Sequence, residues 1–212
     1  MAATPPEPPP DCLLCPRLAA FRHDNAQLFP DWHNAPVPAF GSAEARLLVV
    51  GLAPGLRGAN RTGRPFTGDY AGDLLYAMLI EFGYARGRYG RAADDGLELV
   101  DCRITNGVRC VPPENKPVGS EIKACRPFLA GEIAAMPNLR VILSLGLISH
   151  NTVLAALNER PSAWKFVHGA RHALPGGPIL ADSYHCSRYN TNTGRLTEAM
   201  FRDVFTGIGA IV

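Results

Sequence analysis

Three short runs of apolar residues constrain the fold of this chain more than any other feature of its sequence. They are Arg46–Gly51, Arg140–Gly146 and Ile179–Tyr184, and the first two end on a glycine. Continuous apolar runs of this length are typical of strands that are buried on both faces of a parallel sheet. Because helical patterns separate the runs, the sequence predicts βαβ units and a three-layer α/β/α fold with a central, mostly parallel sheet.

Helical patterns and a further strand complete the predicted α/β order. The expected helices cover residues 12–29, 69–82, 120–136, 149–157 and 197–205, and the further strand region covers Leu97–Thr105. The segment 83–96, rich in glycine and arginine, is expected to be a mobile surface insertion. Ligands of such sheets bind beyond the carboxyl ends of the strands, so the loops that begin at Gly51, Asn106, Gly146 and His185 are the ones to inspect.

Composition and charge exclude several classes of protein. The 21 Lys and Arg residues against 19 Asp and Glu give a formal net charge of +2, so any binding of nucleic acid needs local basic patches. No apolar run approaches the roughly 20 residues that span a bilayer, and the N-terminus lacks the pattern of a signal peptide. We therefore expect a cytoplasmic monomer without membrane contact. Residues 1–11 are expected to be a disordered Pro-rich tail, and residues 12–212 a single domain.

Four of the six cysteines have spacings found among metal ligands. Cys12 and Cys15 form a Cys-x2-Cys pair, and 14 residues separate Cys110 from Cys125. Cytosolic thiols stay reduced, so four thiolates brought together by folding would suit either zinc or an iron–sulfur cluster, and spacing alone does not decide between them. The alternative is that these cysteines are small buried side chains.

The loop between Gly51 and Asp69 follows a strand and precedes a helix. It is not a Walker loop, because no Gly-Lys-Ser/Thr sequence closes it. Small residues such as Gly51 and Ala53 let the backbone approach a flat ligand, Phe66 offers a face for stacking, and Asp69 could position a water molecule. The alternative is a tight turn in which Asp69 only caps the following helix.

A single histidine follows the last of the three apolar runs. His185 begins a polar loop at the carboxyl end of that strand, where it is either a ligand-facing group or a structural one. Arginines flank the same loops and would gather positive potential at the mouth of a site, unless they are merely solvated. These arginines are at positions 57, 61, 64, 188 and 195.

Taken together, the motifs resemble those of the iron–sulfur uracil-DNA glycosylases. The resemblance runs in the same order through Cys12-x2-Cys15, Gly51-Leu-Ala-Pro-Gly55, Thr62-Gly-Arg-Pro-Phe66, Thr105–Pro117, Cys125-Arg-Pro-Phe128 and the His185 loop. Leu52 stands where the family-4 branch has a glutamate. With Leu52, Asn60-Arg-Thr-Gly63 and Thr67-Gly-Asp69, the sequence of this loop resembles that of the family-5 branch, also called the B type.

The resemblance implies a fold, an activity and a cofactor. The single domain would be a uracil-DNA glycosylase domain with a 4Fe–4S cluster on Cys12, Cys15, Cys110 and Cys125. Its partner would be DNA that contains uracil or other deaminated bases such as hypoxanthine and xanthine. The enzyme would flip out the nucleotide and hydrolyse its N-glycosidic bond, which leaves an abasic site. No lysine is well placed at the mouth of the site to form a Schiff base, so a monofunctional enzyme without strand cleavage is expected.

The resemblance also implies roles for individual residues. Asn106 matches the base-reading asparagine, whose amide can donate to uracil O4 and accept from N3–H. Phe66 would stack on the flipped base, and His185 would donate toward O2, where negative charge develops. Asp69 would position the attacking water, with Asn115 as a further candidate.

The remaining expectations concern the edges of the site. Gly51, Leu52 and Ala53 would form the loop beside the base, and Arg188 and Tyr189 are candidates for the wedge that fills the gap in the duplex. Cys186 stands where the family has a proline, so we expect the loop that carries His185 to be less rigid.

Two other functions stay open. A DNA-binding module could sense damaged bases without turnover, with a structural cluster. An iron–sulfur electron carrier is disfavoured, because closely spaced ferredoxin cysteine runs are absent.

Overall fold

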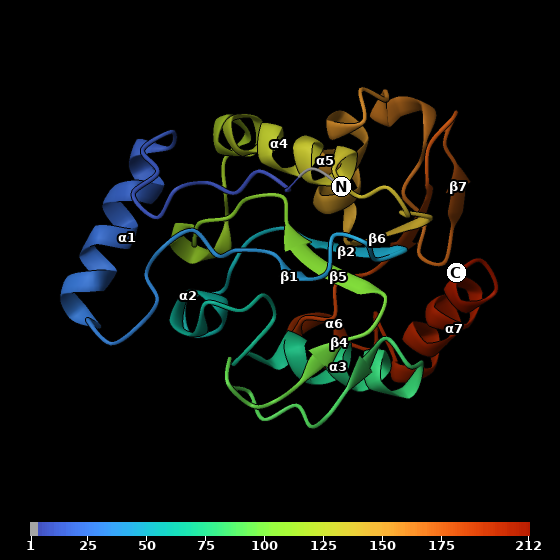
Figure 1. The fold of residues 1–212 in the computed structure, drawn as a ribbon, viewed down its shortest axis with the longest axis horizontal. Helices are drawn as coiled ribbons and strands as arrows, with labels where there is room; N and C mark the ends of the chain where they lie inside the picture. Colours follow the sequence, from blue (N-terminus) through green and yellow to red (C-terminus); the bar gives the residue numbers. More distant parts are fainter. Residues whose placement is uncertain (1–3) are drawn as a thin grey trace.

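A six-stranded sheet forms the middle layer of the molecule (Figure 1). The computed structural model describes residues 4–212, so the first three residues of the expected tail lie outside it. The strand order is β1-β5-β2-β6-β8-β7, with parallel pairing among the four inner strands and antiparallel pairing at both edges. This arrangement confirms the predicted three-layer α/β/α fold with a mostly parallel sheet.

The strands of the large sheet are short. Their bounds are β1 Phe40–Gly41, β2 Leu47–Gly51, β5 Cys102–Asn106, β6 Val141–Leu145, β7 Arg171–Ala173 and β8 Ile179–Ser183. Every residue of β2 and β6 is buried, as their continuous apolar sequences predict. A separate small sheet pairs β3 (Ala85–Arg86) with β4 (Glu98–Leu99).

Helices cover both faces of the large sheet. Their bounds are α1 Pro16–Leu28, α2 Ala59–Thr62, α3 Tyr70–Glu81, α4 Gly119–Ala134, α5 Leu147–Ala156, α6 Arg188–Asn192 and α7 Glu198–Gly209. Leu47 and Val49 pack with α3 and α7, whereas Leu48 and Val50 pack with α4 and α5 on the opposite face (Figure 1). None of the helices within residues 4–212 is long and apolar enough to cross a membrane.

The register of the sheet places several loops at one edge. Gly51 at the end of β2 pairs with Asn106 at the end of β5, and Leu145 at the end of β6 pairs with Ser183 at the end of β8. Since these four strands are parallel, the loops that follow them leave the sheet together. The two 3-10 turns, Pro113–Asn115 and Pro161–Ala163, lie within longer connections.

The described part of the Pro-rich tail is held against the core instead of being free. Glu7 forms ion pairs with Arg109 at 2.8 Å and with Arg103 at 3.6 Å, and it accepts the N–H of Ala39 at 3.1 Å. The ring of Pro6 lies against Gly131 of α4. Prolines have little backbone freedom to lose, so a few ionic contacts are enough to order this segment. We call residues 5–11 the N-terminal strap.

The expected mobile insertion over 83–96 is also anchored. Asp95 forms an ion pair with Arg64 at 2.7 Å, and both side chains are only 5% exposed. Tyr89 stacks on Tyr76 of α3 with the ring centroids 4.5 Å apart. Arg64 therefore serves this internal ion pair, and it does not belong to the basic rim where the sequence led us to expect it.

Candidate active site

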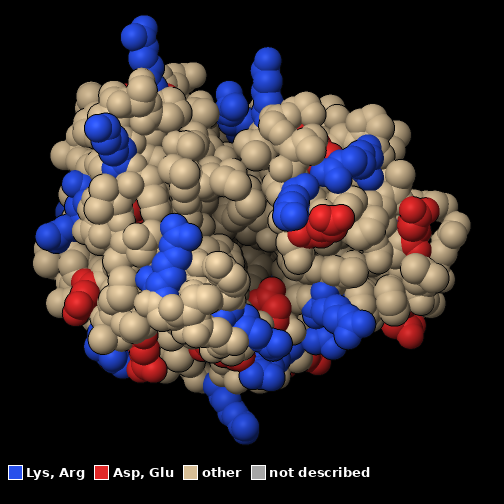
Figure 2. Space-filling model, turned by 180° about the vertical axis from the view of Figure 1, so that it is seen from behind, with Lys and Arg blue, Asp and Glu red and all other residues tan. Residues whose placement is uncertain are grey.

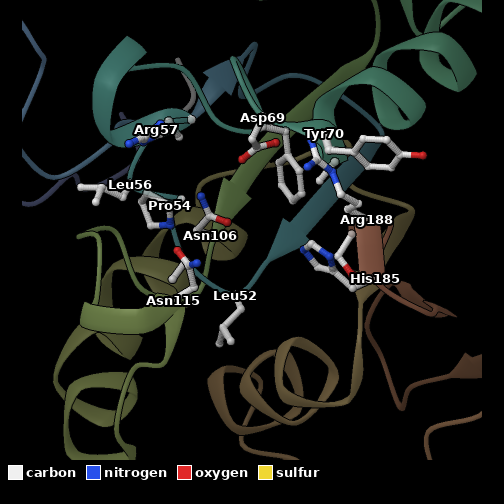
Figure 3. Close-up of a pocket in the computed structure, with 17 residues that line it drawn as sticks. Leu52, Pro54, Leu56, Arg57, Asp69, Tyr70, Asn106, Asn115, His185 and Arg188 are labelled. Carbon is white, nitrogen blue, oxygen red and sulfur yellow. The ribbon is translucent and has the colours of Figure 1, made fainter. Parts of the chain in front are cut away.

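A cavity of about 640 Å³ opens where the loops after β2, β5 and β8 leave the sheet. Figure 2 shows the surface hollowed near the middle of the molecule, and Figure 3 shows the lining side chains. All three residues predicted to be catalytic, Asp69, Asn115 and His185, line this cavity. The lining also includes the predicted base-contacting residues Leu52, Ala53, Phe66, Asn106 and Arg188.

Two of the predicted contact residues lie elsewhere. Gly51 is buried behind the cavity, where a Cβ atom would lie 2.6 Å from the ring of Phe66. Its role is to let the ring approach the backbone. Tyr189 does not line the cavity and is 71% exposed.

Asp69 uses one carboxylate oxygen for a structural contact and directs the other toward the β2–α2 loop. It is the N-cap of α3, and its Oδ1 accepts the N–H of Gly72 at 3.2 Å. The other oxygen, Oδ2, lies over the loop 55–58, because a Cβ on Gly55 would be only 3.1 Å from it. Burial raises the pKa of the Asp69 carboxyl above its ordinary value, against the lowering effect of the Gly72 and Ala71 N–H groups. A raised pKa suits a group that receives a proton.

His185 presents a neutral imidazole to the cavity. Burial lowers its pKa to about 4, so the ring carries no charge at pH 7. Within residues 4–212 no group of the chain forms a hydrogen bond with the ring. Figure 3 shows His185, Asp69 and Asn106 reaching the same space from three sides. The ring is therefore available as a donor to a ligand in that space.

Phe66 forms one wall of the cavity. It has a left-handed backbone conformation, with φ of +52°, and its side chain is 6% exposed. Tyr89 donates a hydrogen bond to its carbonyl at 3.1 Å, and a Cβ on Gly72 would collide with the same oxygen. Its ring centroid lies 5.9 Å from that of His185. These contacts fix the wall against which a flat ligand would stack.

Asn106 ends β5 and is 3% exposed. A Cβ on Gly51 would collide with its Oδ1 atom, so the glycine also makes space for this side chain. Among the described residues, no group forms a hydrogen bond with its carboxamide. The amide thus keeps both its donors and its acceptor for a ligand.

The rim of the cavity carries cationic and aromatic groups. Arg188, at the start of α6, lies over the ring of Tyr70 at 5.3 Å, and Arg57 is exposed on the β2–α2 loop. Sequence reasoning did not include Tyr70. Its position directly after Asp69 was the available signal, because it is the first residue of a helix that begins at the cavity. Asn115, which has a φ of +57°, approaches from the 3-10 turn after Pro112.

The chain as a whole matches a known family. A model of the uracil DNA glycosylase superfamily matches residues 38–208 of the chain. The chain belongs to the uracil-DNA glycosylase superfamily.

Relatives within the superfamily include members of the type-5 and type-4 branches. A type-5 uracil-DNA glycosylase of Thermus thermophilus is 47% identical over 199 residues, which cover 91% of this chain and 90% of the relative. One of Mycobacterium leprae is 42% identical, with 92% and 88% covered. A type-4 uracil-DNA glycosylase of Sulfurisphaera tokodaii is 33% identical, with 79% and 72% covered. The prediction of a family-5 uracil-DNA glycosylase from Leu52 and the Gly51–Asp69 loop is therefore confirmed.

In this uracil-DNA glycosylase superfamily member, the four predicted ligand cysteines come together. Cys12, Cys15, Cys110 and Cys125 line one small cavity beneath the N-terminal strap. None of the six cysteines forms a disulfide within residues 4–212. Within the described residues, the one group of three possible metal ligands that lie close together is His150, His172 and Asp182, and it includes none of these cysteines.

The walls of this cysteine cavity connect it with the active-site loop. Leu18 of α1 and Val108 pack against Cys110 and Cys125, and Ala53 joins the same apolar cluster. The N–H of Arg109 approaches Cys125 Sγ at 3.4 Å. Ala53 also lines the large cavity, so one residue separates the two sites.

Proposed function

We propose that this enzyme excises uracil from DNA by hydrolysing the N-glycosidic bond of a flipped-out nucleotide. The observation that carries the proposal is the convergence of Phe66, Asn106, Asp69 and His185 on one cavity. Membership of a superfamily of N-glycosyl hydrolases supports it, as do the names of the type-5 relatives. The expected product is an abasic site, and the expected enzyme is a monomer of the bacterial cytoplasm.

Recognition of the base would depend on Phe66 and Asn106. The ring of Phe66 is fixed beside Gly51, so a flipped pyrimidine would stack on it. The unpaired carboxamide of Asn106 would donate to O4 and accept from N3–H. Cytosine presents the opposite donor and acceptor at those positions. Hypoxanthine and xanthine present the same pair as uracil, so some excision of these deaminated purines is included in the proposal.

Departure of the base would depend on His185. As the C1′–N bond breaks, its electrons leave with the base, and negative charge develops on O2. A neutral N–H donor in a water-poor cavity stabilises such a charge more in the transition state than in the ground state, which accelerates cleavage. The low pKa of His185, about 4, keeps the ring in this neutral donor form at pH 7.

Attack by water would depend on Asp69. Oδ1 holds the first turn of α3, which leaves Oδ2 to orient a water molecule toward C1′. The oxygen of that water forms the new bond to C1′, and its proton passes to the carboxylate. Cap and general base are therefore compatible roles, because different oxygens serve them. Asn115, across the cavity, would hold the same water from its other side.

DNA would bind across the mouth of this cavity. The exposed side chains of Arg57 and Arg188 are placed to contact phosphates, and Figure 2 shows Lys and Arg around the hollow. With a net charge of only +2, such a local patch is what binding requires. Arg188 would also reach the gap left in the duplex, with Tyr189 beside it on the exposed surface.

A 4Fe–4S cluster on Cys12, Cys15, Cys110 and Cys125 is part of the proposal. The four cysteines line one small cavity, and a set of four thiolates is what a cluster of this type requires. The cluster would join the segment before α1 to the core, and no step of the excision reaction passes through it.

The deciding experiment is incubation of the purified protein with duplexes that each contain one uracil, hypoxanthine, xanthine or cytosine. Alkali then reveals abasic sites as strand breaks. Release of uracil without breaks before alkali supports a monofunctional glycosylase. Binding of the uracil duplex without release would instead support a sensor of damaged bases, and the proposed function would be wrong.

A further inference from the structure

The strand end that carries His185 is held by residues outside the cavity. His168, in the loop before β7, accepts the backbone N–H of Tyr184 through Nδ1 at 3.1 Å. The two rings also stack, with centroids 4.8 Å apart and planes 10° from parallel. Tyr184 directly precedes His185. One imidazole therefore contacts both the backbone and the ring of the residue that leads into the site.

This contact extends the hydrogen bonding between the segment before β7 and the β8 strand. It begins where the backbone–backbone hydrogen bonds between these two segments end. The N–H of Gly169 donates to the carbonyl of Asp182 at 2.8 Å, and the N–H of Asp182 donates to the carbonyl of Ala170 at 2.9 Å. Two residues farther along the chain, directly after the end of β8, the N–H of Tyr184 donates to the His168 side chain. A side chain thus supplies the acceptor that a neighbouring strand would otherwise provide.

The residues after Tyr184 are held as well. The carboxamide of Asn190 donates to the carbonyl of His185 at 2.8 Å, and the side chain of Cys186 is fully buried. The guanidinium of Arg195 lies 4.7 Å from the Tyr184 ring centroid. The sequence led us to expect a less rigid loop because Cys186 replaces a proline. These contacts hold the backbone on both sides of His185.

We propose that His168 is a positioning residue for base excision. By accepting the Tyr184 N–H, it sets the direction from which the His185 imidazole enters the cavity. The proposal rests on the proposed function, in which His185 donates to the departing base. For Nδ1 to accept this N–H, His168 must be neutral with its proton on Nε2, and burial lowers the pKa of His168 below its ordinary value. A displacement of about 1 Å at a catalytic group can cost about 100-fold in rate, so this support has a measurable effect.

Two substitutions at His168 separate its hydrogen bond to Tyr184 from its stacking on the Tyr184 ring. His168→Phe keeps an aromatic ring for stacking but has no acceptor for the Tyr184 N–H. His168→Asn has a shorter side chain, whose Oδ1 can occupy the place of Nδ1. The measured quantities are the single-turnover excision rate at saturating enzyme, the Kd for a uracil duplex, and the Tm. The matched control is Leu154→Ala, which lowers stability in the core on the opposite face of the sheet.

We expect His168→Phe to slow excision about 10-fold or more with a Kd within about twofold of the wild type, and His168→Asn to restore most of the rate. Leu154→Ala should lower the Tm and leave the rate unchanged. Wild-type rates in the Phe variant, or equal slowing in the Phe and Leu154→Ala variants, would overturn the proposal.

NMR measurements on the wild type and the His168 variants test the positioning role separately from the proposed uracil excision. Nitrogen chemical shifts of His168 should show an unprotonated Nδ1, and the ring signals of His185 should move in His168→Phe but much less in His168→Asn. A protonated Nδ1 would refute the positioning role even if uracil is excised. A wild-type protein that releases no uracil refutes the proposed function, whatever the shifts show.

Discussion

The carboxylate of Asp69 lies directly over Gly58, so that a Cβ atom on this glycine would be 2.9 Å from Asp69 Cγ and would overlap Oδ2. Gly58→Ala should therefore move the carboxylate away from the attacking water without removing it. We expect single-turnover excision to fall about 10-fold or more. Gly55→Ala is the graded comparison, because its Cβ would be 3.1 Å from Oδ2. If the Gly58 variant kept the wild-type rate, Oδ2 would not be the oxygen that positions water.

Asp69→Asn separates the helix cap from the chemistry. Asparagine caps helices about as well as aspartate, so the Tm should not fall. It cannot take a proton from water, so excision should slow by roughly 100-fold or more. Measurement of Tm and single-turnover rate on the same preparation checks both. A lowered Tm with a normal rate would reduce Asp69 to a cap.

The raised pKa of Asp69 also predicts a pH dependence of stability. Between its ordinary pKa of 3.8 and the higher value in the folded protein, the folded state binds more protons than the unfolded chain. Ionisation of Asp69 therefore costs stability, and this cost appears as the pH rises through that window. Relative to the wild type, Asp69→Asn should be more stable at pH 7 than at pH 4. Thermal unfolding at several pH values measures the difference, and its absence would contradict burial of the charge.

His185 should affect the pH dependence of stability in the opposite sense to Asp69, because its neutral form is the one that the fold favours. Its pKa falls from the ordinary 6.5 to about 4 in the folded protein, so the unfolded chain binds the proton first. Stability should therefore be lost as the pH falls from 6.5 toward 4, and His185→Gln should lose less of it. An NMR titration of the ring should give a midpoint near 4. A midpoint near 6.5 would show that the imidazole is solvated and not shielded in the cavity.

Cysteine replacements test the proposed cluster. Cys110→Ala should abolish the visible absorption of an iron–sulfur centre, lower the bound iron and reduce solubility, because the apolar cavity beneath the N-terminal strap would be left unfilled. Cys102→Ala is the control, since Cys102 is buried in β5 away from the cysteine cavity. Equal absorption and iron content in the wild type and the Cys110 variant would show that these cysteines hold no cluster.

The parts of the fold that depend on local sequence were predictable. The apolar runs of β2, β6 and β8 and the cap at Asp69 act over a few residues, and the structure places them where the sequence indicated. The two-residue strand β1 and the short α2 were missed, because glycine and proline dominate their segments and their partners are distant in the chain. The loops at the carboxyl ends of the strands led correctly to the cavity, since the parallel topology alone brings them together.

Interactions between distant residues could not be predicted. Arg64 looked like a DNA-facing arginine, but its partner Asp95 is 31 residues away in a segment without a recognisable pattern. His168 attracted no attention for the same reason, since only the folded β7–β8 edge brings it to Tyr184. The N-terminal prolines suggested disorder, because composition cannot show that Glu7 meets a buried charge.

The ion pairs of Glu7 with Arg109 and Arg103 limit where the chain can be shortened. Arg109 is 1% exposed and Glu132 is not exposed, and Arg103 completes the group with Glu7, so two positive and two negative charges cancel inside the protein. A truncated enzyme that begins before residue 7 keeps this balance. One that begins after it leaves an excess guanidinium charge beside Cys110, in a place that water reaches poorly. A shortened enzyme that begins after residue 7 should therefore be less stable than one that retains Glu7.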